Sequence, residues 1–275
     1  MKREESSTIL NIESRLHSKE QVLFDESYKE LLQIESGCLF QKEGIQFGFV
    51  RKEINKDLEE KTFSAYEDIL NTLENRSLYR CWNFVPKINL ETDGTENYKL
   101  FNAGRRRAFD KHYGNYSTNK MSVATGIDIL NNDLIVLFFS GIKNPIHYRN
   151  PEQVSAYDYP KIYGKLPPSF ARATGTHNKY FISGTASIKN HRTVNVDDIK
   201  GQVKTMIDNV KIMLSQNSGK YQQNGIVYLR RTKDIPLVKG MIKKHFPNFS
   251  PVYLEANICR KNLLVEMEMT CDLRL

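Results

Sequence analysis

The order of the predicted secondary-structure elements is the feature that most constrains this fold, because the same order occurs twice along the chain. Each half is expected to run strand, strand, helix, strand, helix, strand, strand. This order predicts two α+β units, each a mixed sheet with its helices on one face. The fold class is therefore α+β with two tandem halves, although the two halves share no useful sequence identity.

The first half follows a charged N-terminal segment. Apolar residues on both sides of Gly44 predict a hairpin over residues 38–50. Asn131 and Asn132 predict a second hairpin between strands near 127–129 and 134–139, because Asn tolerates the positive φ of a tight turn. The other elements expected here are a helix over 63–73 capped by Thr62, a strand over 79–85 and a helix over 101–113.

The second half is marked by one amphipathic helix with Asp197 as its expected cap. Its apolar residues, spaced by fours and a three as one helical face requires, are Ile199, Val203, Ile207, Val210 and Leu214. The remaining elements expected are strands over 169–173, 180–188, 225–231, 252–258 and 263–270, and a helix over 235–246. We therefore expect an arm with one short helix over 1–35, an N-terminal half over 36–145 and a C-terminal half over 146–275.

Composition excludes several classes of protein. The longest apolar run of the 275 residues, at 134–139, is far shorter than the roughly 20 residues of a membrane span. The start of the chain lacks the apolar stretch of a secretory signal, so a cytoplasmic location is expected. Four cysteines and six histidines are scattered, which argues against disulfides and a metal site. The net charge of +8 fits either nucleic acid or a small anionic substrate.

The strand near the C-terminus carries a candidate for proton transfer. Side chains alternate along a strand, so one face holds Leu263, Val265 and Met267, and the other holds Leu264, Glu266 and Glu268. The two carboxylates are then about 7 Å apart. If this face meets the other half without water, burial and mutual repulsion make one carboxyl a proton donor near neutral pH. On pattern alone, a solvated sheet face with ordinary glutamates is the simpler interpretation.

Three further segments carry groups suited to binding an anion. The Pro- and Tyr-rich connector over 141–173 supplies Tyr163 and Arg172, and Arg260 lies close to the carboxylate strand. Small residues over 183–187 (SGTAS), Thr185 among them, suit close approach of backbone to a ligand. In the run 104–107 (GRRR), helical geometry lets one or two arginines face a common site. Each segment also has a purely structural explanation, and from the residues alone that explanation is the better one.

Six stretches in order along the chain together resemble the chorismatase family, whose members remove the enolpyruvyl side chain of chorismate. They are 79–89 (YRCWNFVPKIN), 101–105 (FNAGR), 152–160 (EQVSAYDYP), 163–173 (YGKLPPSFARA), 181–188 (FISGTASI) and 258–268 (ICRKNLLVEME). The second half also resembles the distantly related reactive-intermediate deaminases, the YjgF-like or endoribonuclease L-PSP fold. The resemblance implies two fused YjgF-like, chorismate-mutase-like halves with a pseudo-trimer-like core.

The resemblance also assigns roles to individual residues. Glu266 matches the family's catalytic glutamate, and Arg172 and Tyr163 match substrate-binding positions. Arg105 matches an arginine of the first half that helps to hold a carboxylate. Cys259 matches a position that varies with the product, and we add Thr185 as a substrate-binding candidate.

The implied activity is release of pyruvate from chorismate without a metal or an organic cofactor. The ring product is 3-hydroxybenzoate or a dihydroxycyclohexadiene carboxylate. Three alternatives stay open: an imine or enamine hydrolase of the deaminase type, a non-catalytic protein that binds small aromatic acids, and RNA binding or cleavage, which rests only on the charge and a historical family name. We expect chorismate as the partner, no nucleic acid, no membrane, and a monomer or weak homo-oligomer.

Overall fold

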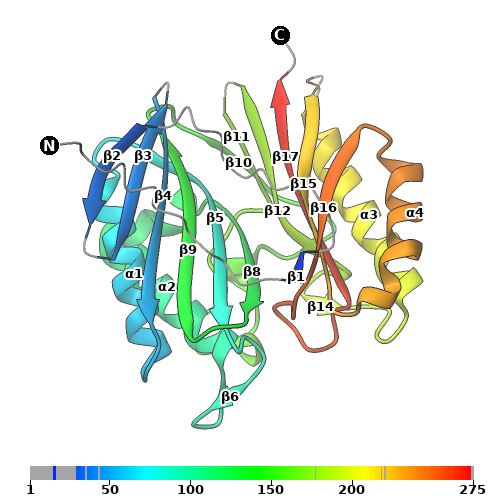
Figure 1. Cartoon of the computed structure of the whole chain (residues 1–275), viewed down its shortest axis with the longest axis horizontal. Coiled ribbons are helices and arrows are strands. Elements are labelled where there is room, and N and C mark those ends of the chain that lie inside the picture. Colours follow the sequence, from blue (N-terminus) through cyan, green and yellow to red (C-terminus); the bar gives the residue numbers. More distant parts are fainter. Residues whose placement is uncertain are drawn as a thin grey trace, which may run out of the picture.

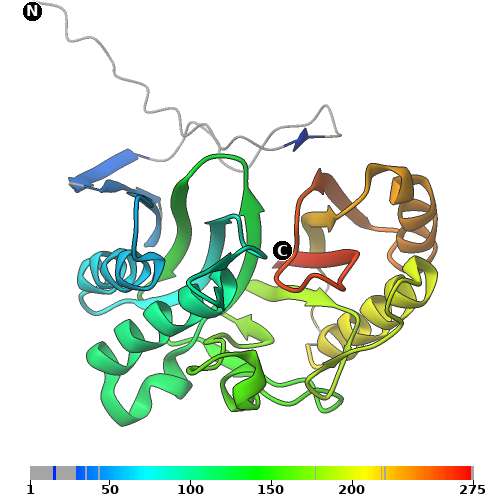
Figure 2. The same ribbon diagram turned by 90° about the horizontal axis from the view of Figure 1, so that it is seen from below.

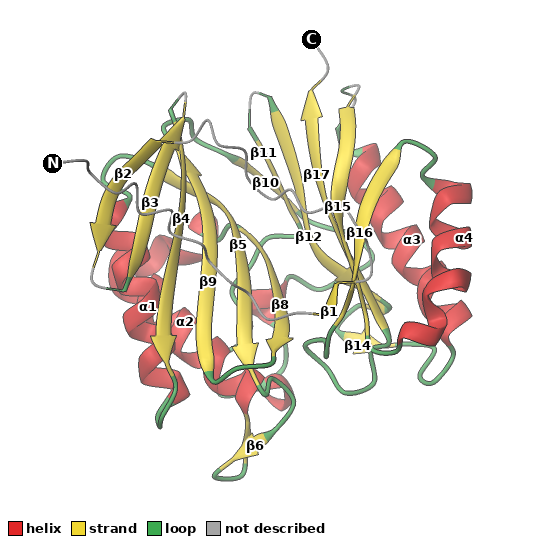
Figure 3. Cartoon of the chain, in the orientation of Figure 1, coloured by secondary structure: helices red, strands yellow, loops and turns green. Residues whose placement is uncertain are grey.

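Two β-sheets lie beside each other in the computed structural model, and each carries a pair of helices on its outer face (Figure 1, Figure 3). The residues that the structure describes are 15–16, 29–34, 36–42, 44–176, 178–217, 219 and 221–273. Viewed from below, the two helix pairs lie on the outer sides of the molecule, with strands between them (Figure 2).

The first sheet has six strands. Its strand order is β2 (Lys29–Ile34), β3 (Gly37–Lys42), β4 (Ile45–Glu53), β9 (Asp133–Gly141), β5 (Ser77–Pro86) and β8 (Val123–Ile129). Helices α1 (Leu58–Thr72) and α2 (Asn97–Tyr113) cover one face. A small hairpin, β6 (Glu91–Thr92) and β7 (Thr95–Glu96), precedes α2.

The second sheet has seven strands. Its order is β1 (Arg15–Leu16), β16 (Phe249–Glu255), β15 (Tyr221–Leu229), β17 (Val265–Leu273), β12 (Lys179–Ala186), β11 (Ala173–Gly175) and β10 (Ile146–Tyr148). Helices α3 (Ile199–Ser215) and α4 (Ile235–His245) cover its outer face. A hairpin of β13 (Ile188–Lys189) and β14 (Arg192–Thr193) follows β12.

The two halves share one topology. The first sheet contains the order β3-β4-β9-β5-β8, and the second contains β11-β12-β17-β15-β16, which is the same path through five strands. One pair in each path is parallel, β5 with β8 and β15 with β16, and the others are antiparallel. The prediction of two tandem α+β halves is therefore confirmed.

Three large apolar clusters among the described residues hold these layers together. One lies between the first sheet and its helices, and a second lies between the second sheet and its helices. The predicted stripe of α3 contributes Val203, Ile207 and Val210 to the second cluster. The third cluster joins the two sheets, with Trp82 and Phe84 of β5 packed in the same group as Ile226 and Tyr228 of β15. The inner face of each sheet is thus buried against the other half.

The predicted hairpin at Asn131 and Asn132 is wrong. Strand β5 lies between β8 and β9, pairing parallel with β8 and antiparallel with β9. Helix α2 connects β5 to β8, and a parallel neighbour needs such a crossover connection. Turn residues indicate only that the chain reverses between two strands that follow each other in sequence. They do not indicate that a third strand, β5, lies between β8 and β9 in the sheet.

Several element boundaries also differ from the prediction. Helix α1 begins after Asp57, and Thr62 lies inside it with its hydroxyl donating to the Leu58 carbonyl at 2.7 Å. The cap of α3 is Asp198, whose Oδ1 accepts from the Gly201 amide at 3.0 Å, and not Asp197.

The predicted strand over 169–173 is instead β11, which starts at Ala173, and Leu263 precedes β17. Residues 29–34 form a strand where an arm with one short helix was expected over 1–35, and most of residues 1–35 lie outside the described residues.

In the described part of the chain, no helix is both long enough and apolar enough to cross a membrane.

Candidate active site

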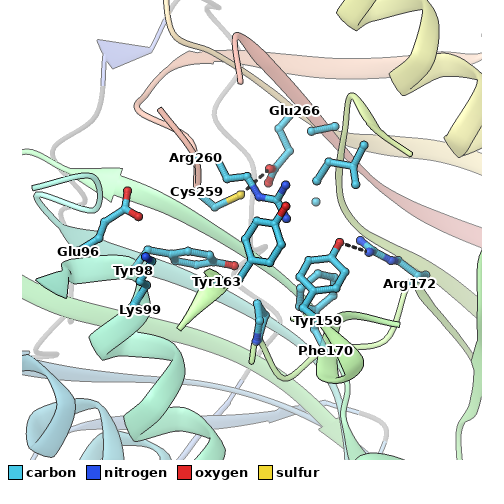
Figure 4. A pocket seen from close by; sticks show the side chains of 14 residues that line it. Glu96, Tyr98, Lys99, Tyr159, Tyr163, Phe170, Arg172, Cys259, Arg260 and Glu266 are labelled. Atoms are coloured by element: carbon cyan, nitrogen blue, oxygen red, sulfur yellow. Dashed lines mark hydrogen bonds between the residues drawn. The ribbon is translucent and has the colours of Figure 1, made fainter. Parts of the chain in front are cut away.

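A cavity lies where the inner face of the second sheet meets the first half (Figure 4). Its volume is about 530 Å³, open solvent at its mouth included. Strand β17, the connector before β11, the loop between β16 and β17, and the start of α2 all supply side chains. The lining residues are Glu96, Tyr98, Lys99, Tyr159, Tyr163, Pro168, Phe170, Arg172, Gly184, Ala186, Ile188, Cys259, Arg260 and Glu266.

The alternation of β17 places Glu266 in this cavity. Val265 and Met267 belong to the apolar cluster under α3 and α4, so the residues between them face the other half. Glu266 lies in register with Tyr228 on one side and Ala186 on the other, and only 3% of its surface is exposed. The prediction that Glu266 and Glu268 share one face of this strand is therefore confirmed. The simpler interpretation of a solvated face with ordinary glutamates is wrong, because this face is buried against the first half.

Burial changes the acidity of Glu266. The pKa of its carboxyl rises from 4.5 to about 8, first because of desolvation and second because of the charge of Glu268. Cys259, Arg172 and Arg80 oppose this shift. The Cys259 Sγ donates to Glu266 Oε2 at 3.8 Å, and burial raises the pKa of that thiol, so it stays protonated. The cavity thus holds a carboxylic acid that is protonated at neutral pH.

Glu268 has different surroundings from Glu266, although only one residue separates them. Its Oε2 forms an ion pair with Arg80 Nη2 at 2.6 Å and accepts from the Thr125 hydroxyl. Its Oε1 accepts from Trp82 Nε1 at 2.5 Å. Glu268 is therefore an anchored carboxylate, held by side chains of β5 and β8.

Two arginines of the second half line the same cavity. Arg172 donates to the Tyr159 hydroxyl at 2.6 Å, and its Cζ lies 5.0 Å from the Phe170 ring centroid. The Cζ of Arg260 lies 4.2 Å from the Tyr163 ring centroid, and its Nη1 donates to the His191 carbonyl at 2.9 Å. Aromatic rings and backbone thus orient both guanidinium groups.

A second cavity of about 310 Å³ adjoins the first and shares Tyr98, Phe170, Gly184, Cys259 and Glu266 with it. Arg105 of α2 lines this second cavity with 2% of its surface exposed. Its Nε and Nη2 are buried, and neither has a hydrogen-bond partner among the described residues.

Within the described residues, no ion pair joins Arg172, Arg260 or Arg105 to a carboxylate. Since buried guanidinium groups need anionic or polar partners, this arrangement suits a small ligand that brings its own carboxylates.

The structure brings together five of the six residues singled out from the sequence. Glu266, Arg172, Tyr163 and Cys259 line the first cavity, and Arg105 lines the second. Thr185 lines neither cavity, and its hydroxyl donates to the Ser183 carbonyl at 2.8 Å. It follows a register shift in the pairing of β12 with β17, and its neighbour Gly184 lines both cavities instead.

Other cavity residues were not selected from the sequence. Tyr98 and Phe170 carried no chemical signal of their own, because a single aromatic residue is usually part of a core. Arg260 was noted for its position near the carboxylate strand but was not assigned a role. Burial raises the pKa of Tyr98 well above 10, so its hydroxyl remains a hydrogen-bond donor in the cavity.

The raised pKa of Glu266 predicts a pH dependence of stability. Its pKa is higher in the folded chain than in the unfolded one, so its contribution is fully present below pH 4.5 and lost as pH rises through about 8. In that window the free energy of unfolding of the wild type should fall by about 1.4 kcal/mol per pH unit relative to Glu266→Gln. Urea unfolding of both proteins from pH 5 to 9 measures this difference. Parallel curves for the two proteins would contradict it.

A family model, a curated relative and a solved structure each match this chain to chorismatases. Residues 28–140 match the family model described as chorismatase FkbO/Hyg5-like, N-terminal. A 3-hydroxybenzoate synthase of Streptomyces hygroscopicus is 34% identical over 236 residues, which cover 76% of this chain and 68% of the relative. The crystal structure of a chorismatase is similar with a TM-score of 0.79 and 28% identity, over 88% of this chain and 79% of that one. A YjgF-family protein of Neisseria meningitidis aligns with 38% of this chain and 88% of its own length, at 18% identity and a TM-score of 0.33.

Proposed function

Because the chain belongs to the chorismatase FkbO/Hyg5 family, we propose that it removes the enolpyruvyl side chain of chorismate and releases pyruvate. One observation carries this proposal. A buried carboxylic acid, Glu266, faces a cavity system that contains three guanidinium groups without a carboxylate partner among the described residues. Chorismate is a dianion with an acid-labile enol ether, so it matches both features.

Substrate binding follows from the two cavities. Arg172 would hold one carboxylate, with help from Tyr163 of the same cavity, and Arg105 would hold the other. Arg260 adds positive charge to the first cavity, where it stacks on Tyr163. Bidentate pairing of an arginine with a carboxylate fixes both position and orientation, which brings the enol ether to Glu266.

The reaction begins with proton transfer from Glu266 to the methylene carbon of the enolpyruvyl group. The methylene becomes a methyl group, and the ether carbon becomes an oxocarbenium-like centre. In a hydrolytic route, water adds to this carbon and the resulting hemiketal collapses to pyruvate and a dihydroxycyclohexadiene carboxylate. In a second route, the ring hydroxyl takes part and the ring aromatises to 3-hydroxybenzoate, with no net consumption of water. Glu266 recovers a proton from the water or the hydroxyl group.

Cys259 would influence which route is followed. Its thiol contacts the Glu266 carboxyl and lines both cavities, so its size affects the space beside the reacting ether carbon. The proposal therefore includes both products as outcomes of one protonation step.

Incubation of the purified full-length chain with chorismate tests the function. Pyruvate is followed by coupling to lactate dehydrogenase, and the ring products are separated chromatographically. We expect pyruvate in equal amount to 3-hydroxybenzoate or to the non-aromatic diol, and the ring product identifies the route.

A rate of pyruvate release no greater than the spontaneous background would overturn the proposal. Release of ammonia from 2-aminoacrylate would then indicate an enamine hydrolase, and tight benzoate binding without turnover would indicate a binding protein.

A further inference from the structure

We propose that Arg80 and Glu268 form a positioning pair that spans the two halves and keeps the proton on Glu266. Arg80 lies on β5 of the first half, and Glu268 lies on β17 of the second. The inference rests on the proposed function, since it concerns how the acid of that reaction is controlled.

The first argument is the rigidity of the pair. Arg80 is completely buried, and its Nη1 donates to the Ile182 carbonyl at 2.9 Å. Its Nη2 contacts both Thr125 Oγ1, at 3.2 Å, and Glu268. The Arg80 Cζ lies 4.5 Å from the Trp82 ring centroid. With Trp82 and Thr125 also donating to Glu268, each oxygen of that carboxylate has a fixed partner.

The second argument is the contrast with Glu266. Within the described residues, the Glu266 carboxyl accepts one hydrogen bond, from the Cys259 thiol, which is a weak donor. Both carboxyl groups lie on the same face of β17, two strand rises or about 7 Å apart. The structure thus stabilises a charge on Glu268 and leaves Glu266 in a site that disfavours a second negative charge.

Several other groups surround Glu266 and set its electrostatic environment. Arg172 from the connector and Cys259 from the β16–β17 loop act on it directly, and its charge is in turn felt by Tyr98 of α2 and Tyr228 of β15. Among the charged groups that act on Glu266, Glu268 has the largest influence and Arg80 a smaller, opposite one. The anion of the pair therefore has the larger effect on the pKa of Glu266.

Removing the anion and removing the cation should shift the pH dependence of kcat/KM in opposite directions. A pair with only a structural role would not produce opposite shifts. In the pH profile of kcat/KM for chorismate, the alkaline limb is the fall in rate as Glu266 loses its proton. Glu268→Gln removes the anion and should move this limb to lower pH by at least about one unit. Arg80→Met removes the cation and should shift the same limb upward. A downward shift of one unit lowers kcat/KM about tenfold at a pH above the limb.

A double variant and a control complete the set. Arg80→Met/Glu268→Gln removes both buried charges, and neutral replacement of a buried pair is often tolerated. Its limb should lie below that of the wild type and above that of Glu268→Gln. The control is Asp133→Asn. Asp133 lies on β9, pairs with Arg51 of β4 and lines neither cavity, so its replacement should leave the limb unchanged.

The ionisation of Glu266 can also be measured without substrate. Carbon-13 NMR of protein labelled at the glutamate carboxyl carbon, with Glu266→Gln to assign the signal, gives the Glu266 titration in each variant. Opposite shifts in this titration support the pair even if chorismate is not turned over, in which case only the proposed function fails. If chorismate turnover requires Glu266 but neither the titration nor the limb moves in the double variant, the positioning pair is overturned.

Discussion

Replacement of Glu266 by glutamine is expected to lower kcat for pyruvate release by about 10²- to 10⁴-fold, the usual contribution of a positioned general acid. The amide keeps the size of the side chain but cannot donate a proton to the substrate carbon as a carboxylic acid can. KM should change little, because Arg172 and Arg105 provide the charge that binds the substrate. The coupled lactate dehydrogenase assay measures both constants.

A matched control separates loss of the acid from loss of structure. Asp133→Asn makes the same change from acid to amide at another largely buried position on the sheet of the first half, and it should keep wild-type activity. The proton-donor role is excluded if Glu266→Gln retains kcat within a few-fold of the wild type.

Gly184→Ala is expected to have the second-largest effect. A Cβ at this position would overlap Glu266 Oε1 and would lie 2.9 Å from Glu266 Cδ and 3.2 Å from Thr125 Cγ2. Because Thr125 belongs to the first half and closes the opposite side, the Glu266 carboxyl itself must move. A displacement near 1 Å of a reacting group can cost about 100-fold in rate, and we expect a fall in kcat of that order.

Gly240→Ala is the matched control for this substitution. Gly240 lies in α4, and a Cβ there would meet no heavy atom within 4 Å apart from its chain neighbours and the backbone of its own helix. Alanine favours a helix interior by about 1 kcal/mol over glycine, so this variant should have a slightly higher Tm and unchanged kcat. Equal activity of Gly184→Ala and the wild type would show that Glu266 is not held against Gly184 in solution.

Periodicity predicted the elements that are amphipathic over a long stretch. The face of α3 and the strand at 79–85 were found because a helix or strand buried on one side must repeat its apolar residues at a fixed spacing. Boundaries were predicted less well, since Asp197 and Asp198 offer the same capping chemistry. Only the backbone conformation distinguishes them, and Asp197 has a φ of +61°.

Much of the site depended on the family resemblance rather than on the residues taken alone. Glu266 and Glu268 have the same residue type and the same face of one strand, so no local pattern assigns them different roles. Their difference comes from Arg80, Trp82 and Thr125, which are more than 140 residues away in sequence. Thr185 was selected as part of a small-residue strand end, but the irregular pairing of β12 turned Gly184 toward the cavity instead.

The sequence by itself determined the α+β class, the repeated element order and the face of β17 that carries both carboxylates. These properties follow from the side-chain periods of two residues in a strand and 3.6 residues in a helix, which can be recognised within a single continuous segment of the chain. The tertiary structure alone decided that β5 separates β8 from β9, that Arg80 pairs with Glu268, and that Glu266 remains buried beside arginines that have no carboxylate partner among the described residues. Each of these outcomes depends on contacts between segments far apart in the chain, where burial and the field of neighbouring charges, rather than residue type, set the chemistry of a carboxyl group.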